Sequence, residues 1–168
     1  MKAALLANGP SRVLFDLQSK NRYNYIIGCN VPWTDVNSTV VLDIGIVQQW
    51  WKNKLPLCPI WFSEHAWRET RFTNRKYFEN HFLGLVKPLP EYDTSGHVAC
   101  SKLIELGYKE IDIYGCDSWF IEDTSSYTHQ FHDTRPENMD KHIIGWRKRW
   151  NSIIENHKDV FINFIGYK

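Results

Sequence analysis

The stretch TSGHVACSKLIELGYKEIDIYGCD, residues 94–117, predicts a helix followed by a strand. Its small-residue turn, 94–96, stands directly before an amphipathic run, and Gly107 is placed where a helix would end. The apolar alternation in EIDIY then predicts a strand that ends at Gly115, with Asp117 just beyond it. A turn of this kind before a helix, and a polar residue just after a strand, raise the question of what they bind.

Short apolar runs recur along the chain and alternate with segments of helical spacing. This alternation is typical of an α/β fold, and we expect a single Rossmann-like domain with a mostly parallel sheet flanked by helices. The predicted strands are 2–7, 25–27, 39–42, 60–62, 111–114 and 160–165, and the predicted helices are 11–17, 44–54, 95–106 and 137–157.

The length of 168 residues fits one domain spanning 1–168. Two segments depart from the regular alternation. Residues 63–92 lose clear periodicity, and we interpret them as a variable excursion with one helix that forms a lid or one wall of a pocket. Residues 118–136 are polar and aromatic and are interpreted as a loop or lid.

Composition excludes several classes of protein. A net charge of +1 argues against a protein that coats nucleic acid, and no apolar run is long enough to span a membrane. The four cysteines are scattered without CxxC spacing, which argues against a zinc site or a disulfide scaffold. Reduced thiols and a cytoplasmic location are the expectation.

One basic cluster is predicted to be a solvated helix face. Trp146 and Trp150 are four residues apart and would share the buried side of a helix. The residues between them, Arg147, Lys148 and Arg149, would then face water rather than a membrane or a nucleic acid.

The ends of the predicted strands carry small and polar residues, and ligands of parallel α/β folds bind at such ends. Free amides at a helix that begins near residue 95, together with the helix dipole, suit the phosphate of a nucleotide. Taken alone, each of these motifs favours a simple turn or helix cap, and it is their joint placement at strand ends that indicates a nucleotide site. Neither GxGxxG nor GxxxxGK[ST] is present. The candidate nucleotide-binding residues are Asn8, Gly9, Pro10, Ser11, Asn30, Asp43, Thr94, Ser95, Gly96, Asp117 and Trp119.

The segments ALLANGPSRVL, YIIGCNVP and TSGHVACSKLIELGYKEIDIYGCDSWF occur in this order along the chain. In this order they resemble segments of the small bacterial sialyltransferases of glycosyltransferase family 42. ALLANGPSRVL is similar to the opening strand and GNGPSL loop of that family, with Ala7 in place of the first glycine. YIIGCNVP is similar to the next strand, and TSGHVACSKLIELGYKEIDIYGCDSWF to the TSG helix, the LGYKEI connection and the Gly-x-Asp strand end. These segments cover about a third of the chain.

The resemblance implies a CMP-sugar type donor, held without a metal by the Asn8 loop, Asn30 and the turn 94–96. It implies that Tyr127 hydrogen-bonds the leaving phosphate, whereas Trp119 stands near the position of a second such tyrosine and has no hydroxyl. It places the catalytic base at His129 or His132, of which His132 is nearer the following helix. The acceptor is left undefined, and a homo-oligomer is compatible with the sequence.

Two alternatives stay open. Asp43 and Asp117 are similar to features of 6-hydroxymethylpterin diphosphokinase-like proteins, which implies Mg²⁺ and ATP. A nucleotide-binding protein without catalysis is the other alternative. The chain is shorter than the sialyltransferases, and the shortfall lies largely in its middle excursion and lid.

Overall fold

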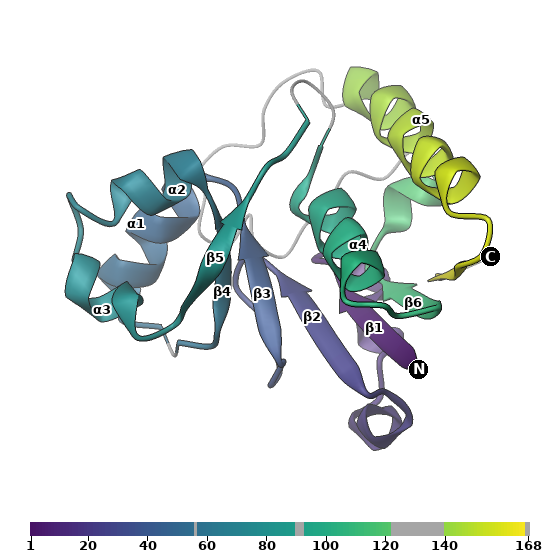
Figure 1. The fold of residues 1–168 in the computed structure, drawn as a ribbon, viewed down its shortest axis with the longest axis horizontal. Helices are drawn as coiled ribbons and strands as arrows, with labels where there is room; N and C mark the ends of the chain where they lie inside the picture. Colours follow the sequence, from purple (N-terminus) through teal and green to yellow (C-terminus); the bar gives the residue numbers. More distant parts are fainter. Residues whose placement is uncertain (56, 90–92, 122–139, 167–168) are drawn as a thin grey trace.

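A computed structural model describes residues 1–55, 57–89, 93–121 and 140–166 of the chain. Within these residues seven strands form one sheet in the order β5-β4-β3-β2-β1-β6-β7, and all six neighbouring pairs are parallel. The predicted α/β class with a mostly parallel sheet is therefore confirmed (Figure 1). The strands are β1 (Lys2–Leu6), β2 (Tyr25–Cys29), β3 (Ser38–Val41), β4 (Ile60–Ser63), β5 (Phe82–Val86), β6 (Glu110–Tyr114) and β7 (Phe161–Ile165).

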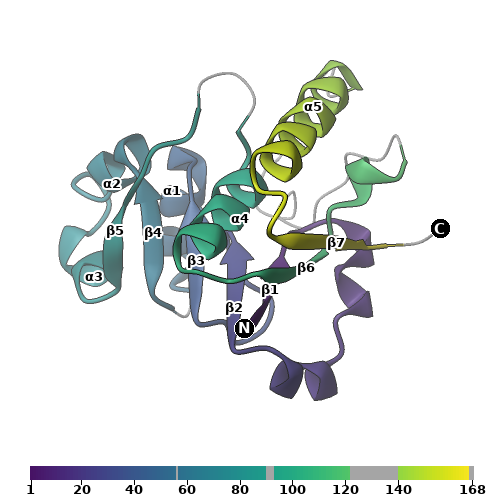
Figure 2. The same ribbon diagram turned by 45° about the vertical axis from the view of Figure 1, so that its right-hand side comes forward.

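Helices lie on both faces of the sheet (Figures 1 and 2). α4 and α5 cover one face, where Leu103 and Trp150 pack against Leu5 of β1 and Ile113 of β6. α1, α2 and α3 cover the other face over β3 and β4, and the 3-10 turns η1 and η2 lie on that same face beside β1 and β2. The helical elements are α1 (Ile44–Asn53), α2 (Glu64–Glu69), α3 (Arg75–Glu79), α4 (Ser95–Glu105), α5 (Asp140–Asn156), η1 (Pro10–Leu14), η2 (Leu17–Arg22) and η3 (Asp117–Trp119).

α4 forms where its sequence predicts a helix. Thr94 is its N-cap, in an extended conformation, and Gly107 follows its end with a positive φ of 88°. Tyr108 N–H donates to the Leu103 carbonyl at 3.1 Å and Gly107 N–H to the Ile104 carbonyl at 2.9 Å, which satisfies carbonyls at the end of the helix. The helix contacts β1, β2 and β3 and therefore lies over the middle of the sheet.

The interpretation of residues 63–92 as an irregular excursion with one helix is wrong. This segment holds α2, α3 and β5, and β5 is an edge strand of the sheet. The two helices are six and five residues long, too short to show a helical period. In β5, Leu83 and Leu85 are about half exposed, so the strand lacks the alternation that marks a half-buried strand.

The predicted helix at 11–17 is also wrong. Residues 10–14 form the 3-10 turn η1, whose N-cap is Gly9, and Ser11 lies inside the turn and is fully buried. Ser11 does not cap a helix because its backbone amide donates to the Asp117 carboxylate of η3 and its hydroxyl accepts the N–H of Gly115, both just after β6.

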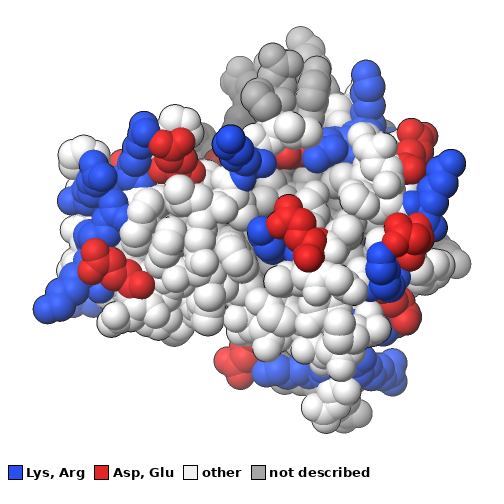
Figure 3. All heavy atoms as spheres, viewed as in Figure 1, with Lys and Arg blue, Asp and Glu red and all other residues white. Residues whose placement is uncertain are grey.

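Charged side chains of both signs are interspersed over the face shown in Figure 3, around its edges and in a small cluster near its centre, with uncharged surface between them. No large field of one sign covers this face, in agreement with the net charge of +1. Among the described helices, none combines the length and apolar character needed to cross a bilayer.

Leu103 and Leu106, at the C-terminal end of α4, test the packing of this helix on the sheet. Leu103 is fully buried and Leu106 is 43% exposed. Leu103→Ala leaves a cavity and is expected to lower the free energy of unfolding by about 3 kcal/mol. Leu106→Ala, as the control, is expected to change it by less than about 1 kcal/mol. Urea denaturation measures both, and equal losses would contradict this packing.

Candidate nucleotide site at the switch point of the sheet

The loops after β1 and β6 lie side by side where the strand order changes direction. β1 pairs with β2 on one side and with β6 on the other. The hydrogen bonding continues past the strands, because Ala7 N–H donates to the Tyr114 carbonyl and Gly9 N–H to the Gly115 carbonyl, both at 2.8 Å. The carboxyl ends of the strands at such a switch point are where parallel α/β sheets bind ligands.

Ser11 and Asp117 join these two loops. The Ser11 N–H donates to the Asp117 carboxylate at 3.2 and 3.0 Å, and the Ser11 hydroxyl accepts the Gly115 N–H at 3.2 Å. Both side chains are buried. Gly9 must be glycine because a Cβ there would lie 2.2 Å from Asp117 Oδ2 and 2.5 Å from the Gly115 carbonyl oxygen. Ser11 and Asp117, both predicted to bind nucleotide, therefore hold the loops together.

Asn8 connects the β1 loop to the end of β2. Its Nδ2 donates to the Cys29 carbonyl at 2.8 Å, and the residue is only 7% exposed. Its Oδ1 is buried and has no hydrogen-bond partner among the described residues. Leaving a buried acceptor unsatisfied costs about 1–3 kcal/mol, so a hydrogen-bond donor from beyond the described residues would stabilise this oxygen.

Asn30 connects the end of β2 to the first turn of α4. Its backbone has a left-handed φ of 56°, a conformation that asparagine adopts more readily than most residues. Its backbone is held by Thr39 Oγ1, which donates to the Asn30 carbonyl at 2.9 Å. Its Oδ1 accepts the Ser95 hydroxyl at 3.0 Å. Asn8, Asn30 and Ser95, predicted from separate motifs, thus meet at the end of β2.

The amides at the start of α4 are suited to an anion. The first amides of a helix have no acceptor within it, and the helix dipole adds partial positive charge. Ser95 and Gly96 supply such amides directly after the N-cap Thr94. We call Ser95 and Gly96 the anion seat.

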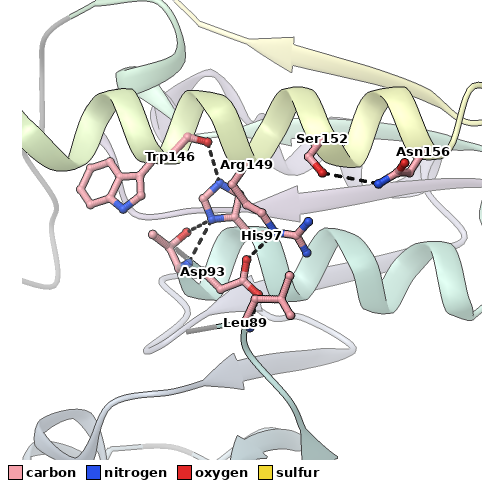
Figure 4. Close-up of polar contacts among 8 residues, drawn as sticks. Leu89, Asp93, His97, Trp146, Arg149, Ser152 and Asn156 are labelled. Carbon is pink, nitrogen blue, oxygen red and sulfur yellow. Dashed lines mark hydrogen bonds and ion pairs between the residues drawn. The ribbon is translucent and has the colours of Figure 1, made fainter. Parts of the chain in front are cut away.

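His97 fastens this turn to α5 (Figure 4). Its Nδ1 accepts the Thr94 N–H at 3.0 Å, and its Nε2 lies 3.1 Å from the Trp146 carbonyl oxygen. The ring also packs on Trp150, with centroids 4.4 Å apart. Burial lowers the pKa of His97 to about 4, so the ring is neutral at pH 7.

An ion pair beside His97 corrects the prediction of a solvated basic face. Arg149 Nε donates to Asp93 Oδ1 at 2.7 Å, and these side chains are only 19% and 3% exposed (Figure 4). Arg147 donates to the carbonyls of Ser118 and Ile121. Both arginines therefore bond to neighbouring loops, whereas Lys148 between them is exposed, as predicted.

The other predicted residues make no contact with Asn8, Asn30 or Ser95 that the structure describes, or lie outside the described residues. Asp43 is exposed at the N-cap of α1, just after β3. β3 lies three strands from β6 in the sheet, and at about 4.8 Å per strand this separates Asp43 from Asp117 by about 14 Å. Trp119 stacks on Phe164, with centroids 4.4 Å apart. Pro10 is in the first turn of η1. Tyr127, His129 and His132 lie outside the described residues, as does most of 118–136.

Of the four cysteines, Cys29 and Cys100 are buried, and Cys58 and Cys116 are partly exposed. All four are free, as predicted. Burial raises the pKa of Cys100 and of Cys116 to about 12, which keeps them protonated and unreactive at neutral pH. Over the described ranges, no group of three or more His, Cys, Asp or Glu side chains is arranged to hold a metal ion.

Sequence reasoning missed His97, Asp93 and Arg149. In a capping box the third helical position usually carries Glu or Gln, so a histidine there gave no signal. The spacing Thr94-x-x-His97 matches that motif once histidine is admitted as an acceptor. The partner of its second nitrogen is a backbone carbonyl, which has no sequence signature.

Taken together, the parallel sheet and its flanking helices define a Rossmann-like α/β fold. Two solved sialyltransferase structures share it. A mutant of the alpha-2,3/8-sialyltransferase CstII matches with a TM-score of 0.59 at 15% identity, over 98% of this chain and 81% of that one. CST-II in complex with a trisaccharide acceptor and CMP matches with a TM-score of 0.54 at 16% identity, over 98% and 80%.

A probable thiamine pyrophosphokinase from Staphylococcus saprophyticus subsp. saprophyticus has a TM-score of 0.41 at 15% identity, over 98% of this chain and 65% of that one. That likeness is too distant to bear on function. The sequence matches no protein-family model and no curated protein. At these identities the comparisons establish the fold.

Gly9→Ala tests the close approach of the two loops. The added methyl would meet Asp117 and a backbone oxygen, and we expect a loss of about 3 kcal/mol in the free energy of unfolding. Gly96→Ala is the control, because its Cβ would meet only ordinary contacts at 3.5 Å. We expect it to change stability by less than about 1 kcal/mol. Chemical denaturation compares the two, and a stable Gly9→Ala protein would contradict the geometry.

The buried His97 predicts a loss of stability in acid. Its pKa is lowered in the folded state, so the unfolded chain binds the extra proton as the pH falls from about 6.5 to about 4. The free energy of unfolding should fall by about 3 kcal/mol over this range. His97→Gln should remove that part of the pH dependence, and replacing the exposed His65 by Gln should not. Denaturation at a series of pH values measures the slopes, and an unchanged slope in His97→Gln would refute this assignment.

Proposed function

We propose that this protein is a sialyltransferase-like glycosyltransferase that moves a sugar from a CMP-type donor to an acceptor hydroxyl. The ordered motifs of the sequence support the proposal, as does a fold shared with sialyltransferases over 98% of the chain. One of those related structures holds CMP and a trisaccharide acceptor. The proposed ligands of this chain are accordingly a nucleotide-sugar and a hydroxyl-bearing acceptor.

The observation that carries the proposal is the buried, unpartnered Oδ1 of Asn8 beside the anion seat. Asn8 meets the end of β2 at Cys29, and Ser95 of the seat meets the next residue, Asn30. An acceptor that lacks a donor and a helix N-terminus that favours an anion therefore stand at one strand end. A nucleotide can satisfy both features. Hydroxyl or amino groups of its ribose or base can donate to the Asn8 oxygen, and its phosphate carries the negative charge that the helix N-terminus favours.

Each group then has a role in transfer. The acceptor oxygen attacks the anomeric carbon of the donor sugar, the bond from that carbon to the phosphate oxygen breaks, and CMP leaves. His132, or His129 in its place, takes the proton of the acceptor hydroxyl. The amides of Ser95 and Gly96, with the Tyr127 hydroxyl, stabilise the charge on the departing phosphate.

We propose that transfer needs no metal. The Asp117 carboxylate already accepts the Ser11 amide, and Asp43 is too far away to share one ion with it. A Mg²⁺-dependent diphosphokinase-like enzyme is the alternative, and it requires these two carboxylates to act together. The separation of about 14 Å between the two strand ends favours the first proposal.

A binding panel distinguishes the glycosyltransferase from the diphosphokinase-like enzyme. Thermal shift and calorimetry with CMP, UDP, GDP, ATP and CMP-sialic acid, each with and without Mg²⁺, should show binding of CMP and CMP-sialic acid that is independent of the metal. Asn8→Ala should weaken CMP about tenfold, as expected for one lost hydrogen bond at a buried site. Asn156→Ala, an exposed asparagine on α5, is the control. Mg²⁺-dependent binding of ATP would support the diphosphokinase, and no nucleotide binding would refute both.

His132→Ala is expected to lower the release of CMP from CMP-sialic acid by about 10²–10⁴-fold, because the reaction loses its general base. CMP affinity should stay at the wild-type value. His129→Ala is the matched control and should have a much smaller effect. Tight CMP binding together with no activity in the wild type, and no change in His132→Ala, would instead identify a nucleotide-binding protein without catalysis.

A further inference from the structure

His97 bonds to two different parts of the fold through its two ring nitrogens (Figure 4). It is 1% exposed and stands in the first turn of α4. Nδ1 faces Thr94, with its N–H and its hydroxyl both 3.0 Å away. Nε2 faces the Trp146 carbonyl oxygen of α5 at 3.1 Å.

These partners fix the protonation of the ring. A carbonyl oxygen only accepts, so Nε2 must carry the proton that it donates to Trp146. Nδ1 then keeps its lone pair and accepts from Thr94. The charged groups facing the ring, Asp93 before α4 and Arg149 on α5, are already paired with each other.

The Thr94 bond bears directly on the anion seat. Thr94 is the N-cap, and its backbone is extended where the next residue is helical. The angle at which the chain enters α4 sets the direction of the Ser95 and Gly96 amides. From the opposite side, Ser95 is held by Asn30 at 3.0 Å. The anion seat is thus held on one side by Asn30, which follows β2, and on the other by His97, which also contacts α5.

We propose that His97 is a positioning residue with separable roles, in which Nδ1 sets the geometry of the anion seat and Nε2 fastens α4 to α5. The proposal rests on the function proposed above, because the seat is where the donor phosphate binds. Glutamine at this position can accept from the N-cap amide, as it does in capping boxes. It cannot at the same time donate to the Trp146 carbonyl on α5, as the second nitrogen of the histidine ring does. Leucine can do neither.

The test compares His97→Gln with His97→Leu at neutral pH. Both variants lose the Trp146 bond, so both should melt at a lower temperature than the wild type. CMP affinity, measured by calorimetry, should fall about tenfold in His97→Leu and be restored to near the wild-type value in His97→Gln. Ser152→Ala, on α5 further from His97, is the control. If affinity falls equally in both variants, in step with stability, the positioning role is overturned.

Two measurements decide the proposal without CMP. Hydrogen exchange at the amides of 94–98 should speed up in His97→Leu and stay slow in His97→Gln, and equal exchange in the two variants would overturn the role of Nδ1. Nitrogen NMR of the wild type should show the Nε2–H tautomer, and an Nδ1–H tautomer would also overturn it. If the wild type binds no CMP, the proposed function fails, and these two measurements still test the role of His97.

Discussion

The hydrogen-bonded contact between the loop after β1 and the loop after β6 is the constraint on which the candidate site depends. Ser11 and Asp117 are 106 positions apart in the chain, yet the amide of one bonds the carboxylate of the other. Gly9 allows the backbones to approach. With these loops fixed, Asn8 is held against the end of β2, and α4 can then present its first turn to the same place. The site is built from contacts between loops that a parallel sheet brings to one edge.

Much of the fold was predicted correctly because helix caps, apolar periodicity and terminating glycines are all read from residues that are close together in the sequence. The helix at 95–105 has a cap, a regular apolar face and Gly107 as its end. The central strands are continuous apolar runs because both of their faces are covered. β5 escaped prediction because it is an exposed edge, and α2 and α3 because they are shorter than the pattern that would reveal them.

The sequence predicted which residues lie near the candidate site better than it predicted what each of them does there. Asn8, Asn30 and Ser95 come together, as expected from polar strand ends in a parallel sheet. Ser11 and Asp117 have the same polar character, but they bond each other, which depends on a long-range contact that no local pattern reports. His97 was missed for a related reason, since one of its partners is a main-chain oxygen on a helix far along the sequence.

The strand order has a consequence for biosynthesis. β1 pairs with β2, the next strand along the chain, but its other neighbour is β6, which begins at Glu110. Until that part of the chain leaves the ribosome, the edge of β1 that will pair with β6 has no partner, and the loop after β1 has nothing to close against. Such distant pairing slows folding, because a long segment must be closed before any contact is gained. The nascent chain therefore carries an open β edge until β6 has emerged, a state in which chaperones or aggregation compete with folding.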